Sequence, residues 1–193
     1  MTDLDELLAK HQAEHVAKLH IKKRLREKLR LSIEENGEGN SQAVVEEVAG
    51  YLRERPFLKV VAVYAALPGE VDLKTLPSLV GCIWVFPKVE GELLSFFQVK
   101  SFEEDLTPGS YGILEPREGL EKIEIERIDL FLCPGLGFDV RGGRIGRGRG
   151  FYDRMLERAR PGAVKLGVCF GHQVVDEVDM EHHDVRMNGV IAG

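Results

Sequence analysis

The stretch DLFLCPGLGFDVRGGRIGRGRGFYDRMLERARPGAVKLGVCF, residues 129–170, decides the fold. It opens and closes with short apolar runs, 129–133 and 165–170, that lack the polar alternation of half-exposed strands. Such runs are typical of strands buried on both faces of a sheet. A glycine-rich loop and a helix-favouring segment, 152–159, lie between them. Strands that alternate with helices predict a mostly parallel α/β sheet.

The remainder of the chain continues this alternation. Residues 2–33 favour a helical arm, since leucine and valine recur at helical spacing without an intervening Gly or Pro. We expect a helix that begins at Ser41 and ends before Pro56, and a short helix at 72–80. We also expect strands at 59–66, 82–86 and 93–99. We expect an α/β fold in a single three-layer domain over residues 1–193, with helices on both faces of the sheet and an N-terminal helical arm over residues 1–35.

Charge is segregated along the chain. The 26 Lys and Arg and 32 Asp and Glu give a net charge of −6, yet residues 141–160 hold seven Arg against two acids. Residues 90–129 hold eleven acids and four bases. Local basic patches on an acidic chain favour binding of a small phosphorylated ligand over a nucleic-acid surface. The sequence has no apolar run long enough to span a membrane and no basic-apolar leader, so we expect a cytoplasmic protein with no membrane partner.

The three cysteines are odd in number and none forms a CxxC pair. Each lies in an apolar context, which favours buried, reduced thiols over a metal site or a catalytic role.

The glycine-rich loop has the composition of a phosphate-binding loop. Gly146, Gly148 and Gly150 allow the backbone to bring its N–H groups close to an anion. Three arginines add positive charge and bidentate donors: Arg144, Arg147 and Arg149. The following helix would offer its N-terminus to phosphate. No GK[ST] follows, and the glycines are spaced GxGxG, so neither the Walker A motif nor the dinucleotide motif applies.

Other interpretations of this loop stay open. The RGGRIGRGRG segment resembles a short RNA-binding RGG tract, although such tracts repeat and lie in polar tails. The glycines could also serve only tight turns. Asp153, in the first turn of the helix, could complement the helix dipole or, beside bound phosphate, hold Mg²⁺.

At these residues the sequence resembles the 5-formyltetrahydrofolate cyclo-ligase family, also called 5,10-methenyltetrahydrofolate synthetases. The family pattern PGLxFD followed by GxRxGxGxGYYD stands here at residues 134–139 and 142–153. Four further motifs of the family occur in order along the chain: KxxLR at 22–26, an acid after the first strand at Glu70, GIxEP at 112–116, and a late HD at 183–184.

The resemblance implies an ATP-dependent closure of 5-formyltetrahydrofolate to 5,10-methenyltetrahydrofolate, with Mg²⁺ and release of ADP and phosphate. Its partners would be ATP and the reduced folate, with no nucleic acid, and we expect a monomer. The implied roles fall into four sets: catalysis by Arg147, Tyr152 and Asp153; ATP binding by Lys22, Arg26, Arg144, Gly146, Arg147, Gly148, Arg149, Gly150, Phe151 and Tyr152; folate binding by Ala65, Glu70, Arg147 and Tyr152; metal binding by Asp153 and Asp184.

The sequence departs from the family pattern in places. Phe151 stands where the family usually has the first of two tyrosines, and Ala65 begins a stretch where many relatives carry a serine. Lys22 and Arg26 also fit an ordinary solvated helix face, and Glu115 before Pro116 could be structural. A non-catalytic nucleotide-binding protein on the same scaffold is the alternative function, and the joint presence of the motif residues favours catalysis.

Overall fold

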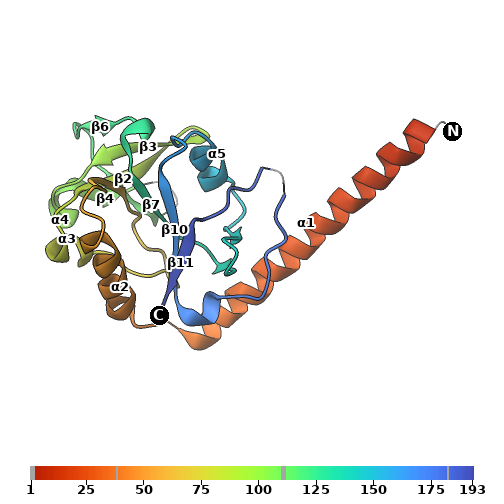
Figure 1. Cartoon of the computed structure of the whole chain (residues 1–193), viewed down its shortest axis with the longest axis horizontal. Helices are drawn as coiled ribbons and strands as arrows, with labels where there is room; N and C mark the ends of the chain where they lie inside the picture. The colour runs from red at the N-terminus through yellow and green to blue at the C-terminus, as the bar shows by residue number, and fades with distance from the viewer. Residues whose placement is uncertain (1–2, 38, 110–111, 182) are drawn as a thin grey trace.

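The computed structural model describes residues 3–37, 39–109, 112–181 and 183–193. Helix α1 (Asp3–Asn36) is one continuous helix, as expected for a segment without Gly or Pro. It ends at Gly37, whose φ of +67° is a left-handed conformation that favours glycine. Its first half projects away from the body of the protein, and Figure 1 shows only its second half beside the remaining chain. The expected helical arm is therefore a single long helix.

Helix α2 (Ser41–Arg53) begins where the sequence predicts it. The Asn40 side chain caps it by accepting hydrogen bonds from the backbone N–H groups of Gln42 and Ala43. Its buried face consists of Val44, Val45, Val48, Ala49 and Leu52.

The sheet has seven strands in the order β11-β10-β7-β1-β2-β3-β6. The strands are β1 (Val60–Ala62), β2 (Ile83–Glu90), β3 (Leu93–Gln98), β6 (Lys122–Ile123), β7 (Leu130–Cys133), β10 (Val164–Cys169) and β11 (Gly189–Ala192). The pairs from β11 through β2 are parallel, whereas β3 and β6 add antiparallel pairs at one edge. The mostly parallel α/β sheet predicted from the sequence is confirmed.

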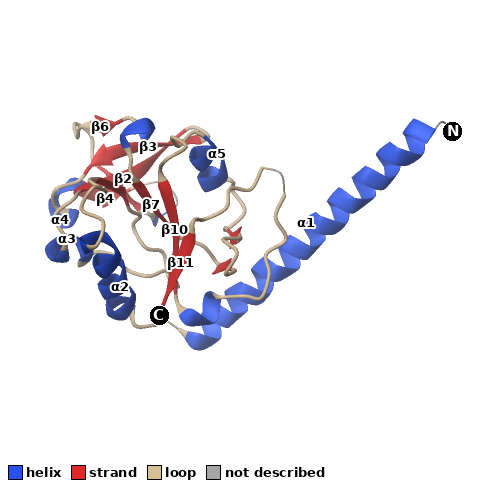
Figure 2. Ribbon diagram, in the orientation of Figure 1, coloured by secondary structure: helices blue, strands red, loops and turns tan. Residues whose placement is uncertain are grey.

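Helices cover both faces of this sheet. On β1, Val61 packs in the same buried cluster as the apolar face of α2. Its neighbours Val60 and Ala62 pack in a second cluster with Met155 of α5 (Phe151–Glu157). Successive strand residues point to opposite faces, so the two helices lie on opposite sides, as Figure 2 shows.

Two local predictions need correction. The helix expected at 72–80 is limited to α3 (Leu76–Leu79), because Asp72 turns the chain by accepting a hydrogen bond from the backbone N–H of Lys74. The strand expected at 59–66 pairs only over β1.

Several short elements complete the described chain: α4 (Phe102–Asp105), β4 (Leu106–Pro108), β5 (Leu114–Pro116), β8 (Gly137–Phe138), β9 (Arg144–Ile145) and the 3-10 turns Ile125–Arg127 and Gly171–Gln173. Strands of this length are too short to show a hydrophobic period, and the sequence did not indicate them. Among the described helices, none is long and apolar enough to cross a membrane.

Candidate active site

One cavity of about 790 Å³ lies between the second half of α1, the chain after β1, the glycine-rich loop and residues 181, 183 and 184. Every residue to which the sequence assigned a site role lines it: Lys22, Arg26, Ala65, Glu70, Arg144, Gly146, Arg147, Gly148, Arg149, Gly150, Phe151, Tyr152, Asp153 and Asp184. These positions are up to 162 residues apart in the sequence, so the fold brings the separate motifs to one place. Their individual roles remain predictions.

A hairpin fixes the start of the glycine-rich loop. Strands β8 and β9 pair antiparallel, and Asp139 lies buried at their turn. Its carboxylate accepts the backbone N–H groups of Arg141, Gly143 and Val178. Burial raises the pKa of Asp139, but these bonds outweigh burial and leave its pKa below the ordinary value. Asp139 of the family pattern is therefore a structural residue that anchors the loop.

The loop itself meets helix α1. Arg26 Nε donates a hydrogen bond of 3.1 Å to the carbonyl oxygen of Gly146. Gly148 has a φ of +102°, and a Cβ placed on it would lie 3.7 Å from Nε of the same guanidinium. Gly150, with φ +69°, precedes α5, which has only seven residues. The turned backbone of the loop therefore fixes Arg26 of α1 at the cavity wall.

The buried Arg144 pairs with the half-buried Asp153 beside the loop. Arg144 Nη2 lies 2.9 Å from Asp153 Oδ1, and the arginine side chain is 4% exposed. The Arg144 guanidinium also lies 5.3 Å from the ring centre of Tyr152. Burial raises the pKa of Tyr152 well above its ordinary value, so its hydroxyl stays protonated. Nε of Arg144 is buried without a hydrogen-bond partner among the described residues.

Glu70 and Arg147 link the loop to the chain after β1. Arg147 Nε donates to Glu70 Oε1 over 2.9 Å, and its Nη2 donates to the carbonyl oxygen of Pro68 over 3.1 Å. The second carboxylate oxygen of Glu70 accepts the backbone N–H of Leu67 at 3.0 Å. Burial raises the pKa of Glu70, and the Leu67 bond and the Arg147 charge oppose that rise only in part.

The sequence left open that Lys22 lies on an ordinary solvated helix face, but the structure buries it. It is 4% exposed, and its ammonium donates to Glu181 and to Asp184. The Lys22 charge and hydrogen bond to the Glu181 carboxylate lower the pKa of Glu181. One lysine therefore forms ion pairs with two carboxylates at the cavity wall.

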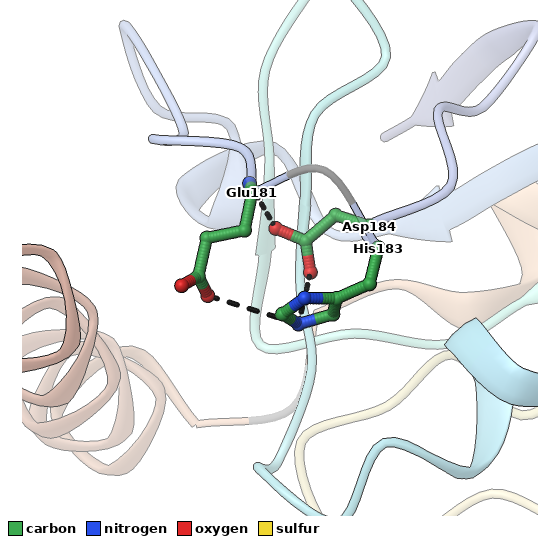
Figure 3. Close-up of side chains that lie close together, drawn as sticks. All are labelled: Glu181, His183 and Asp184. Atoms are coloured by element: carbon green, nitrogen blue, oxygen red, sulfur yellow. Dashed lines mark hydrogen bonds and ion pairs between the residues drawn. The ribbon is translucent and has the colours of Figure 1, made fainter. Parts of the chain in front are cut away.

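The segment 181–184 contains the described carboxylate and imidazole groups that cluster most closely. Glu181, His183 and Asp184 place one potential ligand atom each within 4.8 Å of one another, and Figure 3 shows the three side chains converging. Asp153 is not part of this group, although it lines the same cavity. The two carboxylates predicted to share a metal therefore stand with separate cations, Arg144 and Lys22.

Sequence reasoning missed several polar residues of the cavity, Glu181, Glu115 and Tyr64 among them. Glu181 lies in an acidic stretch with no diagnostic spacing, and its partner Lys22 is 159 residues away. Glu115 was considered structural, yet it is buried at the cavity wall. Tyr64 ends the buried run after β1, and its hydroxyl is buried without a hydrogen-bond partner among the described residues. The GIxEP motif was the available signal for Glu115.

Comparison with known families decides the identity of the fold. Residues 14–193 match the model of the 5-formyltetrahydrofolate cyclo-ligase family. The chain belongs to this family. Membership makes it a ligase of folate one-carbon metabolism, and it confirms the resemblance carried by the glycine-rich loop.

Curated relatives and solved structures agree with this assignment. The 5-formyltetrahydrofolate cyclo-ligase of Haemophilus influenzae is 24% identical over 79% of this chain and 84% of its own. The enzyme of the same name from Saccharomyces cerevisiae is 32% identical, and that match spans about half of each chain, 52% and 51%. The NMR structure of Aquifex aeolicus 5,10-methenyltetrahydrofolate synthetase is 33% identical, covers 89% of each chain and gives a TM-score of 0.73.

Proposed function

We propose that the cavity closes the ring of 5-formyltetrahydrofolate to 5,10-methenyltetrahydrofolate, using ATP and Mg²⁺ and releasing ADP and phosphate. The observation that carries the proposal is one cavity of about 790 Å³, which joins an arginine-rich glycine loop to carboxylates held in ion pairs. Family membership supports ATP and the reduced folate as the two substrates.

The chemistry explains why charge and position matter most. The formyl oxygen of an amide is a weak nucleophile and a very poor leaving group. When it attacks the γ-phosphorus of ATP, an O–P bond forms, the bond to the β-phosphate oxygen breaks, and ADP leaves. The neighbouring N10 then attacks the formyl carbon and loses its proton, and the C–O bond breaks to release phosphate. The protein must hold both substrates in line and neutralise the phosphate charge.

The basic wall of the cavity is assigned to ATP. Arg26 is held on the Gly146 carbonyl through Nε, which leaves its two terminal nitrogens for phosphate oxygens. Arg144, fixed by Asp153, can neutralise charge without losing side-chain entropy on binding. We assign the remaining positions of the ATP set to the same wall: Lys22, Gly146, Arg147, Gly148, Arg149, Gly150, Phe151 and Tyr152.

The wall after β1 is assigned to the folate. Ala65 and Glu70 line it, and Arg147 and Tyr152 lie where it meets the loop. The protonated hydroxyl of Tyr152 can donate a hydrogen bond to the formyl or phosphoryl oxygen. Arg147, held by Glu70, can stabilise the charge that is transferred with the phosphoryl group.

The donor chemistry fits Mg²⁺. Asp153 and Asp184 offer carboxylate oxygens at the cavity wall, and Mg²⁺ prefers one or two carboxylates with phosphate oxygens and waters. Bound there, Mg²⁺ would neutralise the triphosphate and help ADP to leave. Each of the two carboxylates also pairs with a cation of the protein, Asp153 with Arg144 and Asp184 with Lys22.

An oxygen-isotope experiment tests the reaction. Substrate labelled with ¹⁸O in the formyl group should transfer its label to the released phosphate, because the formyl oxygen becomes a phosphate oxygen. Mass spectrometry of the phosphate reads the label directly. Unlabelled phosphate from a complete turnover would contradict phosphoryl transfer to the formyl oxygen. ATP binding with no turnover would favour the non-catalytic nucleotide-binding alternative.

A further inference from the structure

Most carboxylates of the cavity are already paired with a cation. Among the described residues, four of them form ion pairs: Glu70 with Arg147, Asp153 with Arg144, and both Glu181 and Asp184 with Lys22. Glu157 also lines the cavity, but its side chain is exposed to solvent. Each of these groups is therefore balanced by protein or by water.

Glu115 is different. It lies on β5 and is 6% exposed, and no described Lys, Arg or His comes within ion-pair distance of it. Its Oε1 accepts one long hydrogen bond, 3.4 Å, from the backbone N–H of Val89. A buried carboxylate with so little compensation is costly, so a ligand with N–H donors would be strongly favoured beside it.

The surroundings of Glu115 hold it in place. A Cβ placed on Gly109 would lie 2.4 Å from Glu115 Oε2, so only glycine fits against that side of the carboxylate. Thr107 pairs with Glu115 in the ladder between β4 (Leu106–Pro108) and β5. The Gly109 backbone lies on one side of the carboxylate, and the Val89 N–H lies on the other oxygen, so the group is held before any ligand binds.

The adjoining wall is apolar. Pro87, Val89 and Leu94 line the cavity from β2 and β3, beside Leu114 of β5. Such a wall suits a flat ring, and the carboxylate beside it suits N–H groups on the edge of that ring. The two features together specify a planar heterocycle with neighbouring N–H donors.

The folate carries such an edge. Its aminopyrimidinone ring presents the 2-amino group and N3–H side by side, and a carboxylate can accept both. Glu70 is less suited, because Arg147 and the Leu67 N–H already occupy its two oxygens. We propose that Glu115 accepts the aminopyrimidinone N–H groups of the folate and so determines specificity for the pterin ring, an inference that rests on the proposed function.

Separate binding of the two substrates tests this role. Isothermal titration with 5-formyltetrahydrofolate and, independently, with ATP should be carried out on the wild type and on Glu115→Gln. The variant should lose roughly 10- to 100-fold in folate affinity, as expected for hydrogen bonds to a charged group, and keep its ATP affinity. Glu157→Gln, the matched change of an exposed carboxylate in the same cavity, should bind both substrates as the wild type does.

A substrate analogue isolates the contact. The wild type should bind an analogue whose 2-amino group is replaced by methyl much more weakly than the folate, and Glu115→Gln should not distinguish the two compounds. If Glu115→Gln does not fold, Glu115→Asp, which keeps the charge but shortens the side chain, should show the same selective folate loss.

The outcomes separate this role from the reaction itself. Wild-type turnover together with unchanged folate affinity in the folded variant would overturn the role of Glu115 alone. Equal losses of ATP and folate affinity would mean that Glu115 is structural, and would also overturn it. A wild type that does not bind the folate would overturn the proposed function, and the Glu115 assignment with it.

Discussion

Arg147 donates from Nε to Oε1 of Glu70 over 2.9 Å, and this bond ties the glycine-rich loop to the chain that follows β1. The two residues come from motifs 77 positions apart. Arg147 is assigned to both substrates and Glu70 to the folate. In the proposed function the pair therefore lies where the phosphate and the formyl group would meet.

Arg147→Ala should raise the pKa of Glu70 further. Burial already raises it, and the variant removes both the charge and the hydrogen bond by which Arg147 lowers it. A ¹³C carboxyl titration of Glu70 should therefore show its midpoint at higher pH than in the wild type. Arg149→Ala, the neighbouring arginine of the loop, should leave that midpoint in place. An unchanged midpoint in Arg147→Ala would contradict the pairing.

The raised pKa of Glu70 also makes the free energy of unfolding depend on pH. Folding raises the pKa of Glu70 above its ordinary value, so its contribution is fully present at low pH and is lost as pH rises through the folded-state pKa. The stability lost as pH rises should be larger in Arg147→Ala than in the wild type. Urea unfolding across pH 4 to 8 would measure this difference.

Lys22→Met should destabilise the protein by about 3 kcal/mol, because it leaves the largely buried carboxylates of Glu181 and Asp184 without their cation. Lys23→Met is the matched control, since the next residue of α1 is exposed. Its free energy of unfolding should change by less than about 0.5 kcal/mol. Chemical denaturation measures both, and similar values for the two variants would show that Lys22 does not act as the counter-ion.

Asp153→Asn should lose most turnover while folding normally. The amide oxygen can still accept from Arg144, but a neutral group cannot balance Mg²⁺ charge. Addition of Mg²⁺ should therefore strengthen ATP binding in the wild type more than in the variant, as measured by titration calorimetry. Asp184→Asn should behave in the same way. Turnover at the wild-type rate in either variant would contradict its assignment as a metal ligand.

Tyr64→Phe should leave the free energy of unfolding unchanged or raise it by up to about 1 kcal/mol. The hydroxyl is buried with no hydrogen-bond partner in the described part of the chain, and burial raises its pKa well above the ordinary value, so it gains nothing from ionisation or from a hydrogen bond. Thermal or urea unfolding of the ligand-free protein measures the difference. A loss of 1 kcal/mol or more would show that the hydroxyl does make a bond.

Much of the fold was predictable because its signals are local. The buried runs at 129–133 and 165–170 became β7 and β10, and α2 begins at Ser41 as expected, although the capping residue is Asn40. The 72–80 helix was overpredicted, since a side chain-to-backbone turn at Asp72 competes with helix formation.

The site likewise has a part that the sequence predicts and a part that it does not. The glycine-rich loop carries its pattern in one continuous segment, and all its predicted positions line the cavity. The pairing of Lys22 with Glu181 joins the two ends of the chain, and no spacing within either segment indicates it. Burial of Glu115 depends on the pairing of β4 and β5, strands too short for the sequence to predict.

The central claim is that this cavity performs the cyclisation. The most direct measurement follows the near-ultraviolet absorbance of the methenyl product with purified protein, 5-formyltetrahydrofolate, ATP and Mg²⁺, omitting each component in turn. We predict product only when all are present. Product without ATP, or no product from folded protein that binds both substrates, would contradict the account.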